Sequence, residues 1–157
     1  ILWLLEDINI SKKNLILEAE KREVKKERII FSERIPIEDH LERIKLADLF
    51  LDTYPYSAHT TCSDALRAGL PVLTLIGNSF ASRVASSLLK TMNLNELITA
   101  SFKDYENLAN ILSSDQIFYK SIRQKIKDNL NNSKLYDSKL YTKNIEEAYL
   151  KIVNDFN

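Results

Sequence analysis

The stretch LFLDTYPYSAHTTCSDALRAGLPVLTL, residues 49–75, decides the fold that this sequence predicts. It opens with a short apolar run, residues 49–52, and closes with a second run, residues 71–75, both typical of strands that are covered on both faces. Between them, residues 60–68 begin with threonines and are followed by Gly69, which are start and stop signals of a helix. Strand, helix and strand in this order predict a parallel α/β sheet.

The same alternation extends on both sides of this stretch. Residues 2–5 and 28–32 form two further apolar runs with a helical segment, residues 11–24, between them, and Pro36 suits the first turn of another helix. Further helices are predicted at 80–92, 102–112, 116–130 and 139–153. We therefore predict an α/β domain, a parallel sheet with helices on both faces, followed by a helical C-terminal tail. The apolar stripe of the last helix is expected to be packing surface.

Composition excludes several classes of function. The 157 residues contain 22 basic and 22 acidic side chains, so no overall positive field favours nucleic acid. No apolar run approaches the roughly 18 residues that cross a bilayer, and the single cysteine allows no internal disulfide, so we expect no membrane partner and a cytoplasmic location. Because the chain opens within a strand and without an initiator methionine, we expect it to be part of a longer protein.

The most informative chemistry lies where the strand ending at Asp52 meets the helix starting at Thr60 and Thr61. Free N–H groups in the first turn of a helix, together with the helix dipole, favour anions such as phosphate. The connecting loop has no glycine, which excludes a Walker loop and a dinucleotide fingerprint. On spacing alone, Thr60 is equally a simple helix cap, Asp64 a first-turn acid and His59 a surface loop residue.

Resemblance to a known family adds to this reading. LADLFLDTYPYSAHTTCSDALRAGLPVLT, residues 46–74, resembles the O-GlcNAc transferase (SPINDLY-like) family, as do FASRVASSLL at 80–89 and RIIFS at 28–32. The resemblance covers about residues 1–112 and implies a GT-B fold, in which two Rossmann-like domains face each other across a cleft. It makes residues 1–112 the UDP-sugar-binding Rossmann-like domain, with the C-terminal helices of 113–157 packing on it in the same structural unit. The acceptor domain would lie upstream and is absent here.

The resemblance also implies which residues bind the donor. Thr60 and Thr61, with their backbone N–H groups, would bind the diphosphate, and His59 would lie beside it near the sugar. Asp64 would accept hydrogen bonds from the ribose hydroxyls. These three residues, Thr60, Thr61 and His59, are the candidates for stabilising the leaving group, and no residue is assigned as the catalytic base.

The nucleoside end of the donor falls on an earlier part of the chain. By the resemblance, His40 would pack on the nucleoside, Arg43 would approach the uracil, and backbone groups near Ile35 would read the edge of the base. Ile37 departs from the family because some members carry a lysine there, which predicts a weaker contact with UDP. The family's diphosphate-binding lysine would lie just upstream of the first strand.

The function implied is donor binding in an inverting glycosyltransferase that carries UDP-N-acetylglucosamine to Ser or Thr of proteins, with the protein acceptor held largely by the missing upstream domains. The family is metal-independent, and the sequence has neither an Asp-x-Asp pair nor a cluster with metal-ligand spacing, so no metal and no cofactor are expected. Two alternatives stay open: a non-catalytic nucleotide- or protein-binding module, and a glycosyltransferase with a glycan or lipid acceptor. The chain alone is expected to be inactive.

Overall fold

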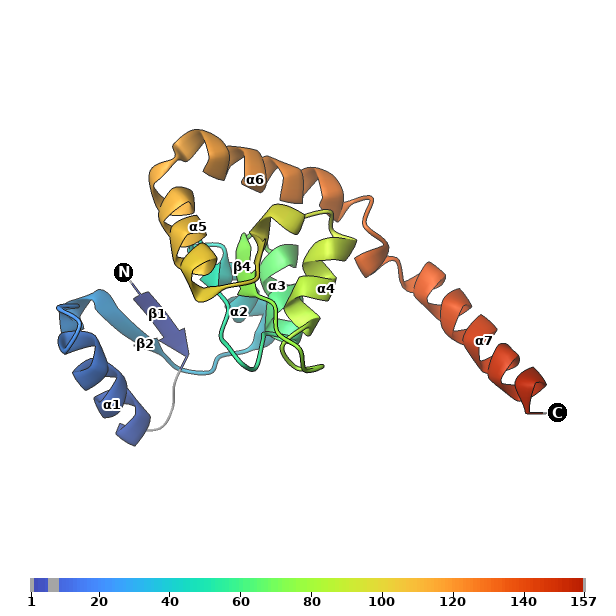
Figure 1. Cartoon of the computed structure of the whole chain (residues 1–157), viewed down its shortest axis with the longest axis horizontal. Helices are drawn as coiled ribbons and strands as arrows, with labels where there is room; N and C mark the ends of the chain where they lie inside the picture. Colours follow the sequence, from blue (N-terminus) through green and yellow to red (C-terminus); the bar gives the residue numbers. More distant parts are fainter. Residues whose placement is uncertain (1, 6–8, 157) are drawn as a thin grey trace. The chain divides into compact units, whose positions relative to one another are not determined.

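The computed structural model describes residues 2–5 and 9–156, with side chains from residue 9 onward, and it divides into two compact units, Ile1–His40 and Leu41–Asn157. In the first unit, β1 (Leu2–Leu5) and β2 (Ile29–Ser32) pair in parallel, with Leu2 opposite Ile29 (Figure 1). They are connected through α1 (Asn9–Glu20) and the short helix η1 (Lys26–Arg28). The two strands and the helix predicted for this region are confirmed.

The charged end of α1 is solvated. Lys21 and Arg22 are exposed and each forms an ion pair with Glu18 at 2.6 Å. The helix ends at Glu20, earlier than predicted, and the following turn places Glu23 in the left-handed region, with φ 61°. A helix does not continue through that backbone conformation.

The second unit is built on a three-stranded parallel sheet in the order β3-β4-β5. Its strands are β3 (Phe50–Leu51), β4 (Val72–Leu75) and β5 (Ile98–Thr99). All four residues of the central strand β4 are buried. Because side chains alternate between the two faces of a strand, helices must cover both faces of this sheet, as predicted. β5 was not predicted from the sequence.

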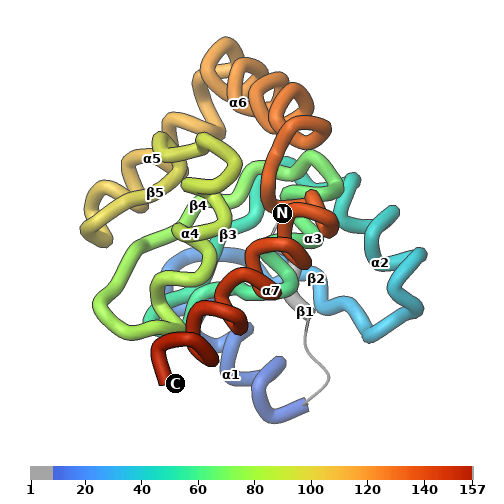
Figure 2. The backbone as a smooth tube through the Cα atoms, turned by 90° about the vertical axis from the view of Figure 1, so that its right-hand side faces the viewer, coloured from blue at the N-terminus to red at the C-terminus, as the bar shows by residue number. Residues whose placement is uncertain are grey.

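Six helices belong wholly or partly to this unit: α2 (Ile37–Ile44), α3 (Thr60–Arg67), α4 (Val84–Thr91), α5 (Phe102–Ser114), α6 (Gln116–Leu130) and α7 (Ser138–Asp155). Short helices η2 (Asn95–Leu97) and η3 (Lys134–Tyr136) precede β5 and α7. α3 ends as predicted: Gly69 has φ 76°, and the N–H groups of Gly69 and Leu70 donate to the carbonyls of Leu66 and Ala65. Figure 2 shows α5 on one side of β4 and α3 on the other.

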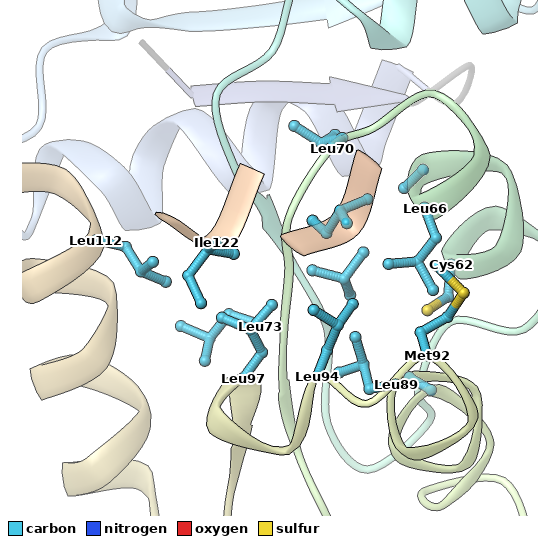
Figure 3. Close-up of a cluster of buried hydrophobic side chains, with 14 residues drawn as sticks. Cys62, Leu66, Leu70, Leu73, Leu89, Met92, Leu94, Leu97, Leu112 and Ile122 are labelled. Atoms are coloured by element: carbon cyan, nitrogen blue, oxygen red, sulfur yellow. The ribbon is translucent and has the colours of Figure 1, made fainter. Parts of the chain in front are cut away.

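The core of this unit lies between the helices and β4. In Figure 3, Leu112 and Ile122 gather near Leu73 on one side, and Cys62 and Met92 lie on the other. α6 belongs to the core through Ile122 and Ile126, whereas α7 buries no side chain. The predicted division between residues 112 and 113 stays a prediction. None of the described helices is long and apolar enough to span a membrane.

Candidate functional site

Three segments meet at the carboxyl edge of the sheet. The loop that follows β3 lies against the loop that follows β4, because the N–H and the hydroxyl of Ser57 both donate to the carbonyl of Ala81, at 3.0 and 2.6 Å. The start of α5 joins them, since the Tyr105 hydroxyl donates to the carbonyl of Asp52 at 2.9 Å. Parallel strands bring their carboxyl ends to one edge, which is where α/β sheets bind ligands.

A pocket of about 390 Å³ opens at this edge. We call it the β3–α3 pocket, because its lining comes from the end of β3, the loop after it and the first turn of α3: Phe50, Leu51, Asp52, Thr53, Tyr56, Ser57, Ala58, His59, Thr60 and Thr61. Its volume lies in the range of small-molecule sites. Three of the residues predicted to bind the donor, His59, Thr60 and Thr61, thus line this pocket.

The first turn of α3 faces this pocket with free donors. His59 occupies the cap position without a side-chain cap bond, and its carbonyl accepts the N–H groups of Cys62 and Ser63 at 3.1 and 3.2 Å. Within residues 9–156, the N–H groups and hydroxyls of Thr60 and Thr61 have no hydrogen-bond partner, and both side chains are exposed. The alternative in which Thr60 is a simple cap is therefore wrong. The free donors and the helix dipole favour an anion here.

Two aromatic side chains contact the His59 ring. Tyr56 stacks on it with ring centres 4.9 Å apart and planes 16° apart, and Phe80 meets it edge-on at 6.2 Å. The Nε2 atom lies 3.4 Å from the carbonyl of Ala81. His59 is one of the residues that line the β3–α3 pocket.

A buried carboxylate, which was not assigned to the site from the sequence, lies beneath the loop. Asp52 is 7% exposed; its Oδ1 accepts the N–H groups of Thr53 and Ala58 at 2.9 and 2.7 Å, and its Oδ2 accepts the Thr74 hydroxyl at 2.6 Å. Burial, with a further contribution from the charge of Asp52, raises the pKa of Tyr105 to about 12. This phenol therefore remains a neutral donor to the Asp52 carbonyl. The sequence signal that was available is an acid at the end of the apolar run of residues 49–52, which predicts a strand.

The other predicted donor residues are not among those that line the β3–α3 pocket. Asp64 is half-buried on α3, one turn after Thr60, and Arg43 is half-buried on α2; neither lines the β3–α3 pocket. Ile35, which is exposed, and His40, which is half-buried, belong to the first unit. The nucleoside contacts predicted for Ile35, His40, Arg43 and Asp64 stay predictions.

Within the described ranges, no group of three His, Cys, Asp or Glu side chains is arranged to hold a metal ion. The predicted independence from metals is not tested by this observation and stays a prediction. Cys62 is fully buried in the core, and burial, with the charge of Asp52 adding to it, raises the pKa of its thiol to about 12. A neutral, inaccessible thiol is neither a nucleophile nor a metal ligand.

Comparison with known proteins defines the class to which this fold and pocket belong. The sequence model of glycosyl transferase family 41 matches residues 1–145. The chain belongs to glycosyl transferase family 41.

Particular relatives agree. A probable UDP-N-acetylglucosamine–peptide N-acetylglucosaminyltransferase, SPINDLY of Petunia hybrida, is 35% identical over 111 residues, which cover 71% of this chain and 12% of the relative. The UDP-N-acetylglucosamine–peptide N-acetylglucosaminyltransferase of Caenorhabditis elegans is 33% identical over 147 residues, covering 94% of this chain and 13% of the relative. This chain thus spans only a small part of these proteins.

A solved structure confirms the predicted fold. A mutant of the O-GlcNAc transferase of Thermobaculum terrenum superimposes with a TM-score of 0.88 and 32% identity, over 94% of this chain and 28% of that chain. The α/β class with a Rossmann-like parallel sheet, the GT-B affiliation and the helical C-terminus are therefore confirmed.

Proposed function

We propose that this chain is the donor-binding part of an inverting glycosyltransferase that transfers N-acetylglucosamine from UDP to Ser or Thr residues of proteins. The names of the relatives support the donor and the peptide acceptor. One observation carries the location of the donor: the open first turn of α3, with the free N–H groups and hydroxyls of Thr60 and Thr61, faces the β3–α3 pocket.

The reaction gives the N–H and hydroxyl groups of Thr60 and Thr61 a defined task. The acceptor hydroxyl attacks the anomeric carbon, the bond from that carbon to the diphosphate oxygen breaks, and its electron pair leaves with UDP while the hydroxyl proton passes to a base that we do not assign. Negative charge therefore grows on the diphosphate in the transition state. N–H and hydroxyl groups already aimed at that charge stabilise the transition state more than they stabilise the bound UDP-sugar, which raises the rate of the chemical step.

Helix α3 is suited to this task without a metal ion. Its N-terminus carries roughly half a positive charge, and its unpaired N–H groups point toward the pocket. The ring of His59, which contacts Tyr56 and Phe80, lies on the sugar side of this site in our proposal. The ribose role of Asp64, the base contacts of Arg43 and Ile35 and the nucleoside contact of His40 belong to the same proposal. So do the cytoplasmic location and the independence from metals.

The test is the double variant Thr60→Val with Thr61→Val in the full-length enzyme, which keeps the side-chain shape and removes both hydroxyls. We expect kcat to fall by at least about tenfold, equivalent to about 1.4 kcal/mol, with a smaller change in the Kd for UDP. Stability should fall by about 1 kcal/mol at most, because neither hydroxyl has a protein partner. Steady-state kinetics with UDP-N-acetylglucosamine and calorimetry with UDP provide the two measurements.

A matched control removes two other threonine hydroxyls. Thr91→Val with Thr142→Val deletes hydroxyls that donate to the carbonyls of Ser87 and Ser138 within helices outside the pocket lining. This control should turn over as the wild type does. A folded Thr60/Thr61 variant with unchanged kcat and unchanged UDP affinity would reject the proposed site, and raised KM with unchanged kcat would reduce the threonines to anchors of the donor.

A further inference from the structure

The loop between β3 and α3 is fastened from below by one carboxylate. Asp52 Oδ1 accepts from the N–H of Thr53 at the beginning of the loop and from the N–H of Ala58 near its end, at 2.9 and 2.7 Å. The other oxygen, Oδ2, accepts the hydroxyl of Thr74 on β4 at 2.6 Å. One side chain therefore joins both ends of the loop to the central strand of the sheet.

The fastened segment leads directly into the proposed diphosphate site. Ala58 is followed by His59, the cap position of α3, and then by Thr60 and Thr61. A displacement of Ala58 must therefore move the first turn of α3 and its free N–H groups. The N–H of Ala58 donates to Asp52 at 2.7 Å, which is the shorter of the two bonds at Oδ1.

The charge of Asp52 makes this arrangement unusual for an anion site. A carboxylate that lies beneath a pocket for a diphosphate repels the ligand, and the repulsion is stronger where solvent is excluded. Such a residue is therefore not selected for by attraction to the donor. Its three hydrogen bonds give the alternative reason for an acid here, since a carboxylate is the side chain that accepts at both oxygens.

We infer that Asp52 is a positioning residue for the donor: its carboxylate holds the 53–58 loop in the shape that keeps the first turn of α3 open to the diphosphate. This inference rests on the proposed donor-binding function and adds to it a residue that does not touch the reacting atoms. Thr74 acts through Asp52 in the same way, from the neighbouring strand.

Two substitutions at Asp52 separate positioning from charge. Asp52→Asn keeps the shape and an oxygen that accepts both N–H groups, with its amide facing the Thr74 hydroxyl, and it removes the repulsive charge. Asp52→Ala removes every one of these bonds. In the full-length enzyme we expect the Ala variant to bind UDP at least about tenfold more weakly than the wild type, and the Asn variant to stay within about threefold of it.

Hydrogen exchange gives a readout that needs no ligand. The amide of Ala58 should exchange much faster in Asp52→Ala than in the wild type, and only slightly faster in Asp52→Asn, because the Asn oxygen still accepts it. Asn129→Ala is the matched control: it removes a partly buried bond of 2.7 Å from Asn129 to the Met92 carbonyl, away from the pocket lining. The control should lose stability without changing UDP affinity or exchange in the 53–58 loop.

A second pair of variants covers the case in which Asp52→Ala does not fold. Thr74→Val removes only the bond to Oδ2, and Thr74→Ser retains it. We expect about threefold or greater loss of UDP affinity in the Val variant and recovery in the Ser variant.

The outcomes distinguish this inference from the function on which it rests. Wild-type affinity in folded Asp52→Ala, or in Thr74→Val where that variant carries the test, overturns the positioning role while the Thr60/Thr61 result still stands. Equal losses in the Ala variant, the Asn variant and the Asn129→Ala control would assign Asp52 to general stability only, and overturn the inference as well. If the wild-type enzyme itself binds no UDP, the donor-binding function fails first.

Discussion

Cys62 shows how one buried residue couples stability to pH. Its thiol ionises near 9.0 when unperturbed, and in the folded chain burial, aided by the charge of Asp52, raises the pKa to about 12. Above pH 9 the unfolded chain therefore releases a proton that the folded chain keeps, so that the free energy of unfolding falls as the pH rises. The contribution is fully present below pH 9 and disappears progressively up to about pH 12.

We predict that the free energy of unfolding falls by about 1.4 kcal/mol per pH unit once the thiol of the unfolded chain is ionised. Urea unfolding at pH 8, 9 and 10 measures it, and Cys62→Ala supplies the comparison, since that variant lacks the thiol. The variant is expected to be less stable at pH 8 because a small cavity remains, yet to lose less stability on going to pH 10. Parallel curves for the two proteins would contradict the assignment.

The site could be predicted only in part from its residues. The threonines at the start of a helix after a strand give a local signal, and His59, Thr60 and Thr61 do line one pocket. The position of Asp52 after a predicted strand did not indicate its hydrogen bonds, and Ser57 gave no signal, because their roles depend on Thr74 and Ala81, which lie 22 and 24 residues away in the sequence. A hydrogen bond between distant segments is specified by the tertiary fold, so no regular spacing in the sequence predicts it.

At the scale of elements, the strands β1 to β4 were predicted from their apolar runs, whereas β5 and the start of α4 were not. β5 has only two residues, and its pairing with β4, Thr74 opposite Ile98, defines it more than its own composition does. α4 begins at Val84, four residues later than predicted. The reason is local: the N–H of Ser79 donates to the Ser82 hydroxyl, and the N–H of Ser82 returns a bond to the Ser79 carbonyl, which forms a turn in place of helix.

Helix α7 is the element whose removal should matter least to the stability of the isolated chain. It buries no side chain, and Tyr141, Tyr149 and Ile152 of its apolar stripe are 67%, 64% and 52% exposed. We expect a chain that ends after Tyr136 to unfold in urea within about 1 kcal/mol of the 157-residue chain, and to be more soluble.

The control for this truncation is a single substitution in the preceding helix that shortens a buried side chain. Ile126 of α6 is fully buried, and Ile126→Ala should cost about 2 to 5 kcal/mol. A truncated chain that loses as much as Ile126→Ala would show that α7 packs on the unit in solution.

At the scale of the whole molecule, our proposal gives this chain the groups that bind the UDP-sugar and not those that bind or deprotonate the acceptor. The chain covers 28% of the Thermobaculum terrenum transferase chain. The β3–α3 pocket contains hydrogen-bond donors for a diphosphate, and no residue is assigned as the base. We expect the 157-residue chain to bind UDP weakly, near the millimolar range (about −4 kcal/mol), and to transfer no sugar. Calorimetry and a transfer assay with a peptide acceptor check the two parts; transfer by this chain alone would contradict the second.

The burial of β4 on both faces limits how this sequence can drift over evolutionary time. A strand with one solvent-facing side keeps half of its positions open to exchange, whereas Val72, Leu73, Thr74 and Leu75 offer none. Three of them tolerate only substitutions that conserve volume, and Thr74 must also keep a hydroxyl for Asp52. Lineages of this domain are therefore expected to conserve the volume and apolar character of three of these positions and the hydroxyl of the fourth, with larger changes confined to the helices that cover the strand.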